Sequence, residues 1–80
     1  MEQFERKVPY KEHDLHVICT HEPDGWAVDA LEVIRNGVCR MLPDFDPFRF
    51  YRTGRAAEHA GLDEARRFVD RMLAGRCGNA

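Results

Sequence analysis

Residues that could bind a metal ion or act in nucleophilic catalysis cluster in one short stretch. The cluster has four members within nine positions and a fifth on a later predicted strand: His13, His16, Cys19, His21 and Cys39. On an extended strand, His13, Cys19 and His21 would point to one side and His16 to the other. A structural zinc site needs four ligands with paired short spacings, and the chain has no C-x-x-C pair. We therefore expect surface histidines beside a buried cysteine, with no metal site.

Other catalytic patterns are weaker still. A cysteine near histidines is not enough without a nucleophile-bearing turn, and 80 residues leave little room for a pocket that excludes water. Asp44 and Asp46 are spaced as in a fragment of a calcium loop, but the glycine and the distal glutamate of that loop are missing. Gly54 and Gly61 match no phosphate-binding glycine loop. The sequence predicts no catalytic residue and no cofactor, so the protein is expected not to be an enzyme.

Charge is divided unevenly along the chain. Residues 1–48 hold ten acidic and five basic residues, a net of −5, whereas residues 49–80 hold seven arginines and four acidic residues, a net of +3. Clustered cations favour nucleic-acid binding, because affinity for phosphates depends on the release of counterions. A basic edge of this kind would consist of Arg49, Arg52, Arg55, Arg66 and Arg67. Intramolecular complementarity with an acidic sheet is the alternative, and we prefer it.

The elements that position these residues begin with three strands. Residues 15–20 are rich in strand formers and run into a Pro-Asp-Gly turn at 22–25. Residues 26–35 form the second predicted strand, where Trp26 is expected to be a core anchor. The Asn36–Gly37 dipeptide is a strong hairpin signal, because both residues tolerate the positive φ of a type I′ turn. A third strand over 38–42 completes a meander.

The flanking segments are less regular. Residues 8–10 are predicted to begin the first strand, with 11–14 as a bulge or turn, and 43–47 are predicted to be a loop. Residues 48–51 are either a short fourth strand or an extended lead into a helix.

That helix begins after the N-cap residue Thr53. Gly61 is expected either to allow close approach to the sheet or to mark a break. Gly75 is expected to be the C-terminal cap, with 76–80 as a frayed tail.

The register set by the two turns groups the apolar residues on two faces. One face should hold Leu15, Val17, Cys19, Ala27, Leu31, Val33, Val38 and Leu42. The other should hold Ile18, Trp26, Val28, Ala30, Ile34, Cys39 and Met41. One amphipathic helix can cover only one face, so the second face is either covered by aromatic side chains or available to a partner. The residues predicted for a partner surface are Leu15, Val17, Leu31, Val33, Val38 and Leu42.

Several short motifs carry a family resemblance. The chain runs from Tyr10–Lys11 through Gly25–Trp26 and a glycine turn to Phe50–Thr53, Ala57 and Phe68–Asp70. This pattern resembles a group of small uncharacterised bacterial proteins built as β-β-β-α. Its outline is similar to the DNA-binding modules of phage integrase arms and plant ethylene-response factors, although the sheet lacks their interleaved arginines. A weaker resemblance is to HicB-type antitoxins. These resemblances imply a β-β-β-α fold and transfer no functional residue.

The whole chain is therefore expected to be a single α+β domain over 1–80, with an ordered core at about 8–75 and the helix packed on one face of an antiparallel sheet. Three cysteines, a polar N-terminus and the lack of a long apolar run favour a cytoplasmic protein without a membrane partner. The first functional hypothesis is a non-enzymatic protein-interaction domain that self-associates or binds another protein. The alternative is a nucleic-acid-binding module.

Overall fold

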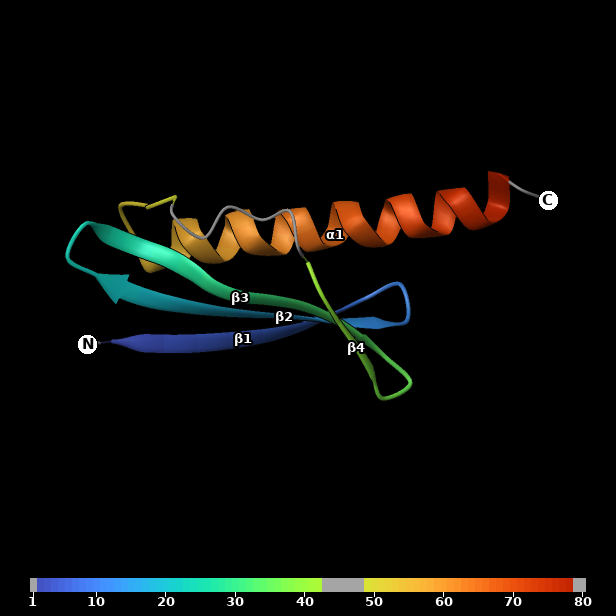
Figure 1. The fold of residues 1–80 in the computed structure, drawn as a ribbon, viewed down its shortest axis with the longest axis horizontal. Coiled ribbons are helices and arrows are strands. Elements are labelled where there is room, and N and C mark those ends of the chain that lie inside the picture. Colours follow the sequence, from blue (N-terminus) through green and yellow to red (C-terminus); the bar gives the residue numbers. More distant parts are fainter. Residues whose placement is uncertain (1, 43–48, 79–80) are drawn as a thin grey trace.

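The computed structural model describes residues 2–42 and 49–78, which form an antiparallel sheet of four strands and one helix (Figure 1). In chain order the elements are β1 (Gln3–Tyr10), β2 (His13–Glu22), β3 (Gly25–Arg35), β4 (Val38–Met41) and α1 (Gly54–Gly78). The strands pair in sequence order, so the sheet is a meander, and α1 lies across one of its faces. The predicted α+β class is confirmed, with one more strand than expected.

The additional strand is β1, and it corrects the prediction for the N-terminal segment. Residues 8–10 do not begin the first predicted strand; they end a separate strand that pairs with β2 along its whole length. Lys11 and Glu12 form the two-residue turn between them, with φ values of 48° and 66°. A type I′ turn normally takes asparagine or glycine at these positions, so the sequence carried no hairpin signal here.

The other two turns agree with the sequence. Asn36 and Gly37 have φ values of 51° and 79°, which confirms the type I′ turn between β3 and β4. Glu22 pairs with Gly25 across the predicted turn between β2 and β3.

The segment before the helix is extended, which agrees with one of the two predictions for 48–51. Tyr51 pairs with Trp26 through two backbone hydrogen bonds of 2.8 and 2.7 Å. A Cβ atom at Gly25 would lie 2.7 Å from the Tyr51 carbonyl oxygen, so the glycine permits this approach. The predicted loop at 43–47 and Phe48 fall outside the described residues.

The helix is continuous and starts as predicted. The backbone N–H of Ala56 donates to Thr53 Oγ1 at 3.1 Å, which confirms the N-cap. The predicted cap at Gly75 is wrong: α1 passes through it to Gly78, and Gly75 lacks the positive φ of a left-handed cap. Residues 76–78, predicted to belong to a frayed tail, are therefore helical. Among the described residues, no helix is long and apolar enough to cross a membrane.

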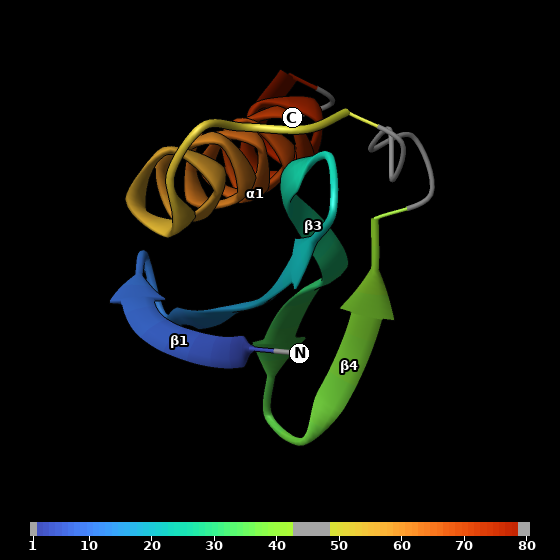
Figure 2. The same ribbon diagram turned by 90° about the vertical axis from the view of Figure 1, so that its left-hand side faces the viewer.

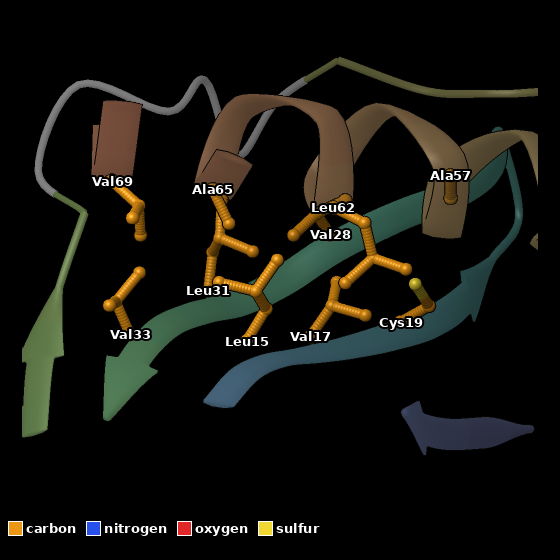
Figure 3. Close-up of a cluster of buried hydrophobic side chains, with 10 residues drawn as sticks. All are labelled: Leu15, Val17, Cys19, Val28, Leu31, Val33, Ala57, Leu62, Ala65 and Val69. Atoms are coloured by element: carbon orange, nitrogen blue, oxygen red, sulfur yellow. The ribbon is translucent and has the colours of Figure 1, made fainter. Parts of the chain in front are cut away.

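The core lies between α1 and the central strands β2 and β3 (Figure 3). Close approach of the helix depends on Gly61, where an added Cβ would lie 2.7 Å from Cγ2 of Val17. This agrees with the first of the two predictions for that glycine. Ten buried residues form the cluster: Leu15, Val17, Cys19, Val28, Leu31, Val33, Ala57, Leu62, Ala65 and Val69.

A β-bulge changes which residues of β3 face the helix. The register shifts between residues 18 and 19 of β2, which leaves Asp29 as the extra residue of β3. Because side chains alternate with a period of two, one extra residue transfers Trp26 and Val28 to the helix side and Ala27 to the other side. The predicted placements of these three residues are therefore wrong. Trp26 nevertheless packs against the core, as expected for an anchor.

The predicted partner surface needs a second correction. Four of its six residues are core residues covered by α1: Leu15, Val17, Leu31 and Val33. The prediction is wrong for these four because the helix already covers this face. Leu42 is half-buried against the core, and only Val38 is largely exposed.

Candidate functional site

Exposed apolar side chains of the described chain concentrate on one edge strand. Val38 and Met41 are 60% and 66% exposed, and both belong to β4. Figure 2 shows this strand at the edge of the sheet farthest from β1. All four residues of β4 are exposed, whereas the neighbouring strand β3 contributes its alternate side chains to the core. This β4 edge, residues 38–41, is the candidate functional site.

Among the described residues, none pairs with the outer side of the β4 backbone. Pairs in an antiparallel ladder alternate between hydrogen-bonded and non-hydrogen-bonded. The N–H of Leu42 donates to the Leu31 carbonyl oxygen at 3.0 Å, which makes this a hydrogen-bonded pair. By alternation, Arg40 bonds inward to β3, whereas the N–H and C=O groups of Cys39 and Met41 point outward. Two residues of β4 can therefore accept another strand.

A polar network lies beside this edge on the open face of the sheet. The Cys39 thiol donates to Glu32 Oε2 at 2.6 Å, and His16 Nδ1 lies 2.9 Å from Glu32 Oε1. His16 Nε2 is buried without a hydrogen-bond partner in the described chain, and Glu5 Oε2 is 3.5 Å away. The hydrogen bond from Cys39 and then that from His16 lower the pKa of Glu32.

The same geometry determines the chemistry open to Cys39. Its hydrogen bond to the Glu32 carboxylate raises the pKa of the thiol, because loss of the proton would place two negative charges together. A thiol is nucleophilic as the thiolate, so this arrangement disfavours covalent catalysis. The other described cysteine, Cys19, is buried beneath α1, and burial raises its thiol pKa to about 11.

The histidines and cysteines are divided between the two faces. His13 and Cys19 lie on the helix side, and His21 stacks on the Trp26 ring at a centroid distance of 4.7 Å. His16 lies on the open face, as the strand alternation predicts. In the part of the chain that the structure describes, no group of three or more His, Cys, Asp or Glu side chains is placed to hold a metal ion.

The five arginines predicted for a nucleic-acid edge fall into two groups. Arg49, Arg52 and Arg55 lie together just before and at the start of α1, and all three are exposed. Arg66 and Arg67 lie about 16–18 Å farther along the helix. Arg67 pairs with Asp63 at 2.9 Å and approaches Glu64. The structure therefore brings the first three together and separates them from the other two.

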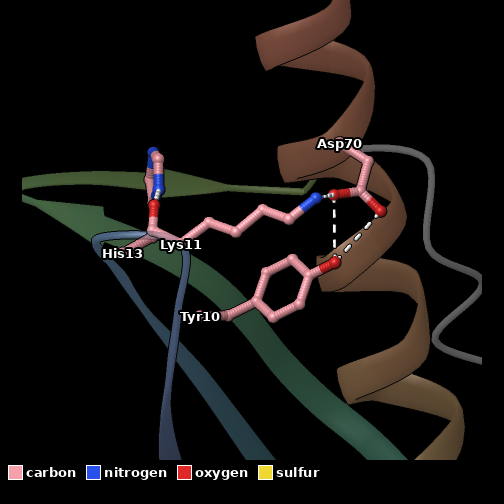
Figure 4. A network of polar contacts seen from close by, with 4 residues as sticks. All are labelled: Tyr10, Lys11, His13 and Asp70. Atoms are coloured by element: carbon pink, nitrogen blue, oxygen red, sulfur yellow. Dashed lines mark hydrogen bonds and ion pairs between the residues drawn. The ribbon is translucent and has the colours of Figure 1, made fainter.

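The opposite edge of the sheet is fastened to the helix (Figure 4). Lys11 Nζ lies 2.7 Å from Asp70 Oδ1, and the Tyr10 hydroxyl donates to the same carboxylate at 3.0 and 3.1 Å. The hydrogen bonds from Lys11 and Tyr10 lower the pKa of Asp70, and Asp70 in turn raises the pKa of Lys11. Arg6 approaches Glu58 at 3.4 Å on the same side.

Sequence reasoning missed the β4 edge as the exposed element. It placed Val38 correctly on the face of the core residues but could not show that α1 packs mainly on β2 and β3 and leaves Val38 exposed. The edge could have been found if the N-terminal segment had been recognised as a strand. That strand is charged, whereas the third predicted strand is short and largely apolar, so the latter would have been identified as the more accessible edge.

Comparison with known proteins finds no match: no protein-family model fits the chain, and neither curated proteins nor solved structures show a match. The resemblances drawn from the sequence remain predictions.

Proposed function

We propose that this protein is a non-enzymatic interaction domain that self-associates by pairing β4 with β4 of a second copy. The observation that carries the proposal is the β4 edge itself: among the described residues no strand pairs with its outer side, and both Val38 and Met41 are exposed. Edge strands with open backbone groups are templates for strand addition. The proposal moves the interaction from the sheet face expected from the sequence to the sheet edge.

A second copy suits this edge because pairing related by a two-fold axis is self-complementary. When such an axis relates two antiparallel strands, each residue lies opposite a residue on the same face of the sheet. One residue therefore lies opposite its own copy, and this residue is the centre of the pairing. If Cys39 is that centre, its outward N–H and C=O groups bond to those of the other Cys39. Arg40 then lies opposite Val38 of the second copy. Centring on Arg40 instead would place two arginines opposite each other, which is destabilising.

Size and edge protection support the same occupant. A domain of 80 residues is near the lower limit for a self-sufficient core, and dimerisation is a common supplement. A second copy covers two unprotected edges at once, whereas an unrelated peptide covers one. The other edge, β1, carries charged side chains and Pro9, which disfavour pairing there.

The test is sedimentation velocity over a wide concentration range with a matched pair of variants. Cys39→Pro removes the outward N–H that the dimer needs and leaves the inward bonds of β4 to β3 intact, so it should remain monomeric. Cys39→Ser keeps a side-chain donor for Glu32 and the backbone N–H, so it should associate like the unchanged protein. The proposal would be contradicted if the unchanged protein stayed monomeric at high concentration, or if both variants associated equally.

The register can be checked by oxidation with a copper catalyst. Two Cys39 thiols opposite each other at a Cα separation of about 5.5 Å are within disulfide range, and each pair would lose two protons and two electrons to the oxidant. We expect a covalent dimer in a Cys77→Ser background and none when Cys39→Ser is added to that background. A dimer by sedimentation that fails to cross-link would contradict this register while leaving self-association in place.

Nucleic-acid binding is the second candidate function. It is supported by the three exposed arginines at the start of α1, for which the described chain shows no ion pair: Arg49, Arg52 and Arg55. Fluorescence anisotropy with labelled oligonucleotides at about 50 and 200 mM salt tests it, because several phosphate contacts should make binding strongly salt-dependent. Charge reversal of Arg52 and Arg55 should abolish such binding and leave self-association intact.

A further inference from the structure

A pocket of about 320 Å³ opens at the end of the sheet, on the side that α1 covers. This volume lies within the range of small-molecule sites. The polar residues that line the pocket come from three strands and a turn: His13, Arg35, Asn36 and Arg40. Apolar contacts come from the sheet and from the C-terminal half of the helix: Val33, Val38 and Met72.

Among the described residues, the two positive charges of this pocket have one counter-charge nearby, the exposed Glu12 beside Arg35. Arg35 pairs with Val38 and Arg40 pairs with Val33, so the two arginines lie on the same face as diagonal neighbours. Such neighbours are about 7–8 Å apart, so two long side chains at these positions can both contact one small ligand. In the described chain, Arg35 approaches only exposed Glu12, at 4.0 Å, and Arg40 contacts Met72 Sδ at 3.9 Å. An anion between the two guanidinium groups would relieve their repulsion.

The neighbouring polar groups add further hydrogen-bonding capacity. His13 is 4% exposed, and its Nδ1 lies 2.7 Å from the Lys11 carbonyl oxygen. Because a carbonyl only accepts, Nδ1 carries the proton, so Nε2 accepts a hydrogen bond from a protonated ligand oxygen and donates one only when the imidazole is charged. Asn36 brings a side-chain amide from the adjoining turn. Guanidinium groups bind carboxylates and phosphates through paired N–H donors, which makes arginine the better cation for this task.

The helix end does not oppose an anion here. The negative end of a helix dipole acts within the last turn, and Met72 lies six residues before the end of α1 at Gly78. The apolar wall formed by Val33 and Met72 suits a compact carbon group beside the charged one. We propose that this pocket binds a small organic anion, with a carboxylate or phosphate between Arg35 and Arg40 and an apolar group against that wall. This inference does not depend on self-association.

The test is a titration followed by ¹H–¹⁵N correlation spectra, with phenyl phosphate, benzoate, inorganic phosphate and benzyl alcohol as probes. Binding of the first two should shift the amides of residues 13, 33–40 and 72. Arg35→Gln or Arg40→Gln should weaken binding about tenfold to a hundredfold, as expected for the loss of a charge-assisted hydrogen bond. Arg40→Lys keeps the charge without the planar fork and should weaken it less. Arg52→Gln, an exposed arginine outside the pocket, is the matched control and should have no effect.

Each contrary result has a definite meaning. If the amide shifts extended over residues 49–55, or if Arg52→Gln weakened binding as much as the pocket variants, the anion would be bound by diffuse charge attraction and not by the pocket. Benzyl alcohol binding as tightly as phenyl phosphate would overturn the requirement for an anion, and equal affinity for inorganic phosphate would overturn the apolar part. Absence of shifts with every probe would overturn the proposal as a whole. The spectrum of each variant also shows whether it is folded, so a loss of binding is read only from folded protein.

Discussion

The two edge strands of this sheet differ in how far they are protected against pairing with another strand. β1 pairs over eight residues, carries Pro9 and charged side chains on its exposed positions, and is fastened to α1 through Tyr10, Lys11 and Asp70. β4 has four residues, all exposed, and its described polar contact with the helix is that of Arg40 with Met72. Natural sheets block their edges against unwanted pairing with the devices seen on β1. The contrast indicates that β1 completes the fold and that β4 is the edge left accessible.

The largest expected difference between the edges concerns stability. Phe4 of β1 is half-buried against the core, and its ring lies 5.4 Å from that of Trp26. Phe4→Ala should lower the free energy of unfolding by about 2–4 kcal/mol, somewhat less than for a fully buried phenylalanine. Met41→Ala on β4 should change it by no more than about 0.5 kcal/mol in dilute solution. Urea unfolding at low protein concentration measures both, and similar losses would contradict the assignment of β4 as an accessory edge.

A second effect concerns the contact that holds the helix against the central strands, which lie between the two edges. At Gly61 an added Cβ would lie 2.7 Å from Val17 Cγ2, whereas at Gly75 no atom lies within 4 Å. Gly61→Ala should therefore destabilise the protein by about 1–3 kcal/mol through overpacking, against a gain of up to about 1 kcal/mol in helix propensity. Gly75→Ala gains helix propensity without overpacking, so it should be neutral or stabilising. Thermal unfolding compares the two variants, and a stabilising Gly61→Ala would show that the helix can move away freely.

The sequence predicted the half of the sheet that contains strong turn chemistry. The Asn36–Gly37 dipeptide located β3 and β4 because its residues suit positive φ. Thr53 located the start of α1 because its hydroxyl oxygen accepts a hydrogen bond from the first turn of the helix. β1 was missed because Lys11 and Glu12 adopt positive φ without the residues that usually signal it. Local patterns hold no information on the bulge at Asp29 or on how far α1 extends over the sheet.

The pocket, too, could not have been predicted from local patterns. It needs Arg35 and Arg40 on one face, His13 from another strand and Met72 from the helix, and only tertiary packing brings these together. The sequence singled out arginines by their clustering along the chain, and this criterion selects neighbours in sequence. Arg35 and Arg40 are adjacent through the β3–β4 register instead.

The two hairpins offer a test of about 1 kcal/mol. Glu12 has φ +66° with an exposed side chain, and the left-handed region is unfavourable for residues other than glycine. Glu12→Gly should stabilise the β1–β2 hairpin by about 0.5–1 kcal/mol, because glycine adopts this conformation without a steric penalty. Gly37→Ala, at φ +79° and with open space around it, should destabilise the β3–β4 hairpin by a similar amount. Urea midpoints that move in the same direction for both variants would contradict this account of the turns.

The smallest expected effect is a difference between the two edges in how their stability falls at low pH. Asp70 fastens β1, Glu32 receives the Cys39 thiol beside β4, and hydrogen bonds lower the pKa of both carboxyl groups below their ordinary values of 3.8 and 4.5. A carboxyl group with a lowered folded-state pKa stabilises the protein above its unfolded pKa. That stabilisation is lost as the pH falls through the folded-state value. Both groups are accessible to solvent, so screening keeps the effect modest.

Two variants assign this acid sensitivity to an edge. Asp70→Asn should flatten the fall in stability between about pH 5 and pH 3 and remove the early acid loss of hydrogen-exchange protection in β1. Glu32→Gln should do the same for β4 and leave β1 unchanged. Urea midpoints at each pH, with amide exchange read separately over residues 3–10 and 38–41, measure the two responses. If either variant altered protection at both edges equally, the edges would open as one unit, which would contradict the assignment of each carboxyl group to one edge.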